Sequence, residues 1–274
     1  MILVGTSGFS YPDWRGTFYP ENLPARDMLS YYAERFPFVE LNTTFYRLPE
    51  AGFLARMAAR TPDGFGFVVK AFQDLTHRQH LLEPAALAAT FSAFRAALDE
   101  LEGRLEAVLV QFPNSFRNNP QNQDYLADWR RRMEDLPVII EFRHRSWLTG
   151  EVEQLLRRER LAFAAVDEPR LPGLLPPVAW SSAAPAYVRF HGRNAAKWYN
   201  HQASHERYDY LYTAEELGEW LPTLRRLDSE TGRVLVAFNN HYQGKAPANA
   251  QTLRALLSGG EASAASSLEQ ESPT

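Results

Sequence analysis

Residues 138–143 combine a strand signal with groups that could do chemistry. The segment 138–140 is Val-Ile-Ile, which favours a buried strand, and Glu141 and Arg143 follow it. Successive side chains of a strand alternate, so Glu141 and Arg143 share one face. Burying charges costs free energy unless they are paired or used. The segment therefore predicts an ion pair or a binding site at the end of a strand.

Other apolar segments end in polar side chains with the same spacing. Glu40 and Asn42 are two residues apart at the end of one segment, and Arg189 and His191 at the end of another. Each pair can therefore point in one direction from its strand. Four further apolar segments end in a single polar residue, at Lys70, Gln111, Asp167 and Asn239.

The types of these residues favour anion binding and proton transfer. Arginine presents a planar fork that binds phosphate or carboxylate through two contacts, so Arg143 and Arg189, with Lys70, are the predicted anion ligands. Glu141 and His191 are the predicted proton-transfer pair, because acid–base catalysis needs only hydrogen-bond reach. The remaining residues have supporting roles in this prediction: Glu40 and Asp167 assist catalysis, and Asn42, Gln111 and Asn239 hydrogen-bond the ligand.

Two other interpretations of the same residues remain open. The charges could form a buried ion-pair network without a ligand, although a ring from six or more strands is costly to keep dry. A divalent metal could bind Glu40, Glu141, Asp167 and His191 in a hydrolase or isomerase. Against a metal, the neighbouring arginines would pair with the same carboxylates, and no His-x-His or His-Glu-x-x-His motif occurs. We therefore predict no metal ligands.

Aromatic residues gather in the expected loops. Residues 9–19 contain five of them, and others lie at 45–46, 147 and 198–199. They could form walls around the site or a small core beneath the loops. Interleaved with arginine, they could also stack the bases of single-stranded or damaged nucleic acid, but the formal net charge of −4 argues against that partner. No Gly-x-Gly-x-x-Gly motif follows an expected strand, so a dinucleotide is not expected and the cofactor is left open.

The segments that must position these residues alternate between short apolar runs, which are typical of strands, and segments with the apolar spacing of helices. Apolar runs predict eight strands, at residues 2–5, 38–42, 66–70, 107–112, from 138 onward, 161–167, 186–192 and 234–239. Helical spacing predicts helices at 25–36, 50–60, 84–101, 121–133, 151–159, 213–228 and 247–257. Thr213 and Glu216 have the spacing of a capping box. The proline-rich residues 169–177 have no helical pattern.

This alternation predicts a single (β/α)8 TIM-type barrel over residues 1–258. Strands that alternate with helices imply right-handed crossovers and a parallel sheet, and eight such units fit a barrel of about 250 residues. An open doubly wound sheet is the alternative. In a barrel all strand ends meet at one face, which here would carry long aromatic-rich loops. Residues 259–274 are mostly Ser, Ala and Glu, and we expect a disordered tail there.

Composition excludes several classes of site. The chain has no cysteine, which rules out disulfides, thiolate catalysis and cysteine-bound metals. There is no signal-peptide pattern at the start and no run of about 18 apolar residues, so we expect a cytoplasmic protein without a membrane partner. The oligomeric state is left open.

Several motifs together resemble one known family. They are residues 5–11 (Gly-Thr-Ser-Gly-Phe-Ser-Tyr), 39–47 (Val-Glu-Leu-Asn-Thr-Thr-Phe-Tyr-Arg), 141–144 (Glu-Phe-Arg-His), 187–192 (Tyr-Val-Arg-Phe-His-Gly) and 238–241 (Phe-Asn-Asn-His). They resemble the YecE-like proteins, whose domain of unknown function is number seventy-two, over about residues 2–257. The resemblance implies a TIM-type barrel and supplies no settled activity. From the residues, we predict an enzyme or binder of a small phosphate- or carboxylate-bearing ligand, with the reaction left open.

Overall fold

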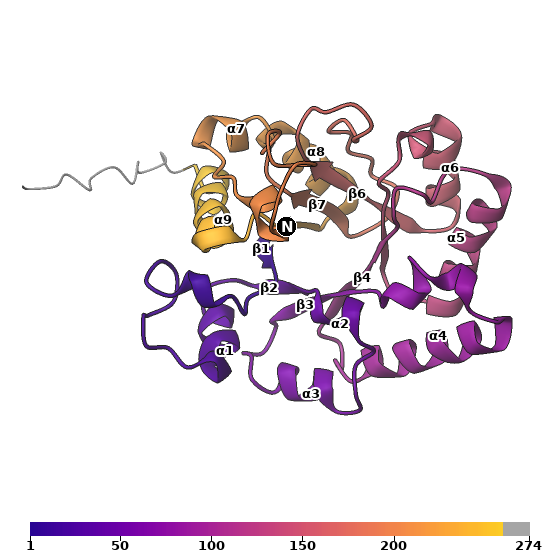
Figure 1. The fold of residues 1–274 in the computed structure, drawn as a ribbon, viewed down its shortest axis with the longest axis horizontal. Coiled ribbons are helices and arrows are strands. Elements are labelled where there is room, and N and C mark those ends of the chain that lie inside the picture. The colour runs from indigo at the N-terminus through magenta and orange to yellow at the C-terminus, as the bar shows by residue number, and fades with distance from the viewer. Residues whose placement is uncertain (260–274) are drawn as a thin grey trace, which may run out of the picture.

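A closed barrel of eight parallel strands forms the centre of residues 1–259, the part of the chain that this computed structural model describes (Figure 1). Each strand pairs with the next along the chain, and the first pairs with the last. The predicted (β/α)8 barrel is therefore confirmed, and the open sheet was the wrong alternative. The strands are β1 (Ile2–Ser7), β2 (Phe38–Leu41), β3 (Gly66–Lys70), β4 (Leu105–Gln111), β5 (Val138–Glu141), β6 (Leu161–Asp167), β7 (Ala186–Phe190) and β8 (Val234–Phe238).

Helices connect most of the strands and surround the barrel (Figure 1). The α-helices are α1 (Met28–Ala33), α2 (Thr43–Tyr46), α3 (Phe53–Ala58), α4 (Pro84–Asp99), α5 (Pro120–Met133), α6 (Gly150–Arg158), α7 (Ala214–Gly218), α8 (Leu221–Thr231) and α9 (Lys245–Leu257). Short 3₁₀ turns are η1 (Pro12–Trp14), η2 (Ala25–Asp27), η3 (Gln73–Leu75), η4 (Gln79–Leu81), η5 (Arg145–Trp147), η6 (Ser204–Tyr208) and η7 (Tyr242–Gly244). As predicted, the proline-rich segment between β6 and β7 has no helix.

The segment 213–228, predicted as one helix, is in fact two. Pro222 lies in the first turn of α8, where its missing N–H does no harm, so a new helix begins there instead of α7 continuing. The predicted capping box is present: the Thr213 hydroxyl accepts from the Glu216 N–H, and the Glu216 carboxylate accepts from the Thr213 N–H.

Two apolar cores lie on opposite sides of the sheet. The larger one fills the space between strands and helices. The smaller one fills the barrel interior with side chains such as Phe38, Ile139 and Tyr187. The next inward-facing residues along these strands are Glu40, Glu141 and Arg189. The side chains that fill the barrel interior therefore change from apolar to charged between one inward-facing residue and the next.

Several of the aromatic loop residues are buried and stabilise the loops rather than lining a site. Trp14 and Tyr19 are buried and stack on each other, and the Trp14 indole donates to the His241 carbonyl at 2.6 Å. This contact joins the loops after β1 and β8. Trp147, one of the residues that could have formed a wall, is buried and stacks on Phe142. The small core beneath the loops is therefore present.

The predicted disordered tail lies outside the described residues except for Gly259. Within residues 1–259, no helix has the length and apolar composition needed to cross a membrane.

Replacing Gly5 with alanine should destabilise the barrel. An added methyl group would lie 2.4 Å from the Phe38 carbonyl oxygen, which belongs to the neighbouring strand and cannot move away freely. We expect a loss of about 1–3 kcal/mol in the free energy of unfolding, measured by urea denaturation. Gly218→Ala is the control, since nothing lies within 4 Å of the added methyl group. Equal stabilities of the two variants would contradict this packing.

Candidate functional site

Arg189 joins opposite parts of the barrel through two carboxylates. Its Nε and Nη2 donate to the Glu40 carboxylate at 2.8 and 2.7 Å, and its Nη1 donates to Glu141 Oε2 at 2.5 Å. The Tyr187 hydroxyl donates to Glu40 at 2.7 Å. Glu40 and Glu141 have no exposed surface. The three charged side chains therefore form a closed layer across the barrel interior.

A second set of contacts extends from Glu141 toward the mouth of the barrel. Glu141 Oε1 lies 2.5 Å from Arg143 Nη2 and 3.5 Å from His191 Nε2. Arg143 Nη1 also lies 3.3 Å from Glu168 Oε2. Burial alone would raise the pKa of Glu141, but Arg143 and Arg189 overcome it and hold the pKa well below its usual range. Glu141 is therefore an ionised carboxylate at neutral pH.

His191 lies within this layer as a neutral imidazole. Burial, and then the nearby Arg143 and Arg189, lower its pKa to about 3. Its Nδ1 lies 3.0 Å from the Asn239 amide, and its Nε2 lies 3.2 Å from Arg143 Nη2. A neutral imidazole has one accepting nitrogen, and the NH2 group of Asn239 faces Nδ1, so Nδ1 accepts from Asn239. His191 therefore lies between the Asn239 amide and the Arg143 guanidinium group.

A cavity of about 640 Å³ opens above this layer, at the carboxyl ends of the strands. All six residues that the sequence predicted as ligand-binding contribute to its wall: Asn42, Lys70, Gln111, Arg143, Arg189 and Asn239. The predicted catalytic residues Glu40, Glu141 and His191 lie beneath the wall, without exposed surface. The structure thus brings nine of the ten predicted residues into one assembly.

All the charged residues that line the cavity are positive. They are Arg60, Lys70, Arg143 and Arg189, and no Asp or Glu from residues 1–259 lines it. Lys70 Nζ donates to Gln111 Oε1 at 2.8 Å and lies 4.4 Å from the centre of the Phe45 ring. Burial, and then Arg189, lower the pKa of Lys70 to about 8.

Comparison with known proteins places the chain in a family. Residues 3–273 match the family model described as "Protein of unknown function DUF72". The chain belongs to the DUF72 family. The YecE-like resemblance predicted from the sequence motifs is therefore confirmed.

One relative matches nearly the whole chain, and another matches just over half of it. The chain is 31% identical over 270 residues to the UPF0759 protein YunF of Bacillus subtilis, a match that spans 94% of this chain and 95% of YunF. It is 28% identical over 163 residues to the UPF0759 protein YecE of Escherichia coli K12, a match that spans 58% of this chain and 54% of YecE.

Solved DUF72 structures have the same fold. The structure of a DUF72 family protein from Thermotoga maritima has 38% identity and a TM-score of 0.84, covering 94% of this chain and 99% of that one. A DUF72 family protein from Enterococcus faecalis has 28% identity and a TM-score of 0.85, covering 94% and 96%. The family name supplies no reaction, so function must be argued from the site.

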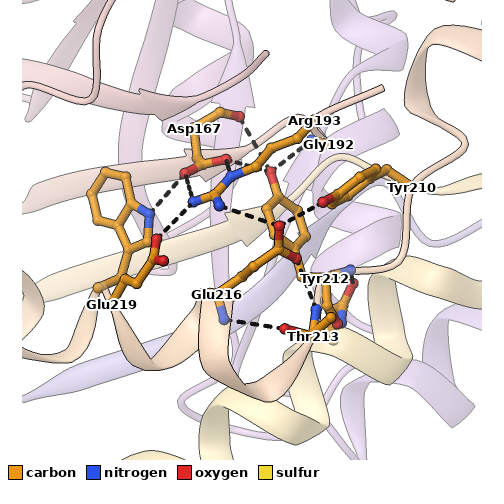
Figure 2. Close-up of polar contacts among 10 residues, drawn as sticks. Asp167, Gly192, Arg193, Tyr210, Tyr212, Thr213, Glu216 and Glu219 are labelled. Carbon is orange, nitrogen blue, oxygen red and sulfur yellow. Dashed lines mark hydrogen bonds and ion pairs between the residues drawn. The ribbon is translucent and has the colours of Figure 1, made fainter. Parts of the chain in front are cut away.

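Asp167, predicted as a catalytic residue of the same group, lies elsewhere. It points outward from β6 to the helix layer, where it accepts two hydrogen bonds from Arg193, one from the Tyr212 hydroxyl and one from the Trp220 indole, each at 2.8 Å (Figure 2). Because even-numbered residues such as Ala162 and Ala164 face the barrel interior, Asp167 has the opposite orientation. Its position at the end of β6 was therefore misleading, and the alternation within that strand was the better signal.

Several residues of the site were missed from the sequence. Glu168 follows Asp167 with the inward orientation, and its buried carboxylate faces Arg143. Tyr11 and His241 stack at a ring distance of 4.6 Å and form part of the cavity wall. They follow the first and last strands, so the closure of the barrel brings them together. That closure was itself predicted and could have identified them.

The donor set for the metal alternative is not assembled. No group of three or more His, Asp or Glu side chains in the described residues is arranged to hold a metal ion. Glu40 and Glu141 already pair with Arg189, and Asp167 lies outside the barrel interior.

Replacing His191 with glutamine should remove part of the acid sensitivity of folding. His191 stays neutral in the folded protein down to its pKa of about 3, whereas the unfolded chain takes up that proton near pH 6.5. Its contribution to stability is thus present above pH 6.5 and is lost as the pH falls toward 3. Between pH 7.5 and 5, wild type should lose about 2 kcal/mol more than His191→Gln in urea unfolding. Equal losses would contradict a neutral His191.

Replacing Asp167 with asparagine should destabilise the fold without changing the cavity. The change leaves Arg193 without its buried partner, and we expect a loss of about 3 kcal/mol in the free energy of unfolding. Glu219→Gln is the matched control: Glu219 contacts the same Arg193 at 3.4 Å but is 64% exposed, so its loss should cost under about 1 kcal/mol. Equal losses of stability in both variants would contradict the conclusion that Asp167 is the main partner of Arg193.

Proposed function

We propose that this protein binds a small phosphate- or carboxylate-bearing ligand at the mouth of the barrel and acts on it as an enzyme. One observation carries the proposal: the charged residues of the cavity wall are all cations, while the carboxylates that pair with Arg143 and Arg189 are buried beneath the wall. A concave site of this size lined by one sign of charge concentrates ligands of the opposite sign.

Buried carboxylates fix two of the cations, Arg143 and Arg189, in place. Glu40 holds two of the Arg189 nitrogens, and Glu141 contacts both Arg189 and Arg143. Guanidinium groups held in one orientation lose little further freedom when a ligand binds, which favours affinity. Arg143 Nε and Asn42 Oδ1 are buried without a hydrogen-bond partner among the described residues. Both residues line the cavity, so these unpaired polar atoms lie directly behind its wall.

Proton transfer, in this proposal, belongs to groups that reach the cavity. Glu141 and His191 lie under the wall, and their contacts with Arg143 suit them to orienting its guanidinium group. Lys70 lines the cavity, and its pKa of about 8 is close to neutral pH, as efficient acid–base catalysis requires.

The aromatic residues at the mouth support a second candidate. Tyr46 is 72% exposed and lines the same cavity as Tyr11 and Tyr208. Exposed rings beside cations can stack the bases of single-stranded or damaged nucleic acid. The net charge of −4 favours the small ligand over this candidate.

Replacing Lys70 with methionine should stabilise the protein and weaken anion binding. The change removes a desolvated ammonium group, so the melting temperature without ligand should rise. Affinity for inorganic phosphate and for small dicarboxylates, measured by calorimetry, should fall about tenfold or more with the loss of one charged ligand.

Lys197→Met is the control, because Lys197 pairs with Glu206 outside the cavity. If no small anion binds to wild type, or if both variants bind equally well, the proposal is wrong. Tight oligonucleotide binding that weakens steeply with salt and is lost in Lys70→Met would favour the nucleic-acid candidate instead.

A further inference from the structure

We infer that Lys70 is a nucleophilic amine that forms an imine with a small anionic aldehyde or ketone bound in the cavity. The inference rests on the proposed function and names its substrate class. The arginines would hold the carboxylate or phosphate, and Lys70 would attack the neighbouring carbonyl carbon.

The composition makes a lysine at this position informative. The chain has three lysines, Lys70, Lys197 and Lys245, among 29 basic residues, so the other 26 are arginines. Arginine binds anions well but stays protonated and cannot act as an amine nucleophile. A site made only for binding could have used arginine, which is the common basic residue of this chain. The barrel mouth instead carries a lysine at position 70.

The partners of the three lysines differ. Lys197 pairs with Glu206 at 2.9 Å, and Lys245 pairs with Asp209. Lys70 instead donates to the neutral amide of Gln111, and no carboxylate in residues 1–259 lies within 4 Å of its nitrogen. A carboxylate in direct contact would strongly stabilise the protonated, unreactive form. At Lys70 the nearby Glu141 and Glu40 raise the pKa, but they offset only part of the lowering by burial and by Arg189.

The surroundings of Lys70 favour its neutral form. Arg189 and Arg143 share the cavity wall with it. Burial and the repulsion from Arg189 lower its pKa to about 8. About a tenth of Lys70 is then the free amine at pH 7, far more than for a lysine with the ordinary pKa. Desolvation and a neighbouring cation are the means by which enzymes activate imine-forming lysines.

The proposed step is balanced without a further reagent. The lone pair of the neutral amine forms the C–N bond, and the π electrons of the carbonyl move to its oxygen. The two amine protons transfer to that oxygen, which then leaves as water while the C=N bond forms. The guanidinium groups of Arg143 and Arg189 hold the anionic group of the substrate during these transfers.

Reductive trapping tests this inference on the intact protein. Glyoxylate, pyruvate and dihydroxyacetone phosphate are each incubated with the protein and sodium cyanoborohydride, which reduces an imine to a stable secondary amine. Peptide mapping by mass spectrometry then assigns the label among the three lysines. We expect Lys70 to be labelled at least about tenfold faster than Lys197 and Lys245, because a lower pKa gives more free amine.

Two controls make the result decisive. Lys70→Met should lose the fast label, and Lys197→Arg should keep it. Inorganic phosphate and lactate, which have no carbonyl group to trap, should slow the labelling of Lys70 by occupying the cavity.

The outcomes separate this inference from the proposed function. If phosphate or lactate raises the melting temperature of wild type but none of the three carbonyl probes labels Lys70 faster than the other lysines, the inference is overturned and anion binding stands. If no anion binds and Lys70 is not labelled, both fail. Fast labelling of Lys70 that phosphate or lactate slows supports both.

Discussion

The hydrogen bonds of Arg189 with Glu40 and Glu141 are the constraint on which the carboxyl-terminal half of the barrel interior depends. One buried guanidinium group is shared between Glu40 and Glu141, which belong to strands on different sides of the barrel. Removing such charges from water costs several kcal/mol per ion, and apolar residues would often fill the same space at lower cost. The cluster is therefore weak as an explanation of stability. It is better explained as a scaffold that holds other charged side chains in fixed positions.

Those positions follow from the two-residue period of the strands. On β5, Ile139 belongs to the inner apolar core and Glu141 to the carboxylate layer, and Arg143, two residues past the end of the strand, belongs to the cavity wall. Along β7, Tyr187 and Arg189 repeat the change from core to charge. Glu40 and Glu141 lie one step deeper than Lys70 and Arg143, so the charged groups that line the cavity are positive although the chain as a whole is acidic. A local anion site and a net charge of −4 are thus compatible.

The sequence predicted the fold and six residues of the cavity wall because both depend on short-range periodicity. Alternating apolar runs identify β5 and β7, and in a parallel barrel their polar ends must meet at one face. It could not give the depth of each side chain, so Glu141 and His191 were expected to contact a ligand that the structure would place above them. Asp167 was misplaced because its position at a strand end outweighed its orientation. Closure of the barrel brings Tyr11 and His241 to the same face, but their stacking depends on how two long loops fold over the barrel, which no local pattern encodes.

The central claim is that Lys70, with the two arginines held by buried carboxylates, creates an anion site at the barrel mouth. Crystals of the protein grown with selenate would test it directly, since the anomalous signal of selenium locates the bound anion. The account predicts a peak in the cavity, within hydrogen-bond distance of Lys70 Nζ and the Arg143 guanidinium group. Selenate bound only to exposed arginines such as Arg26 and Arg47, with the cavity empty at saturating concentration, would contradict it.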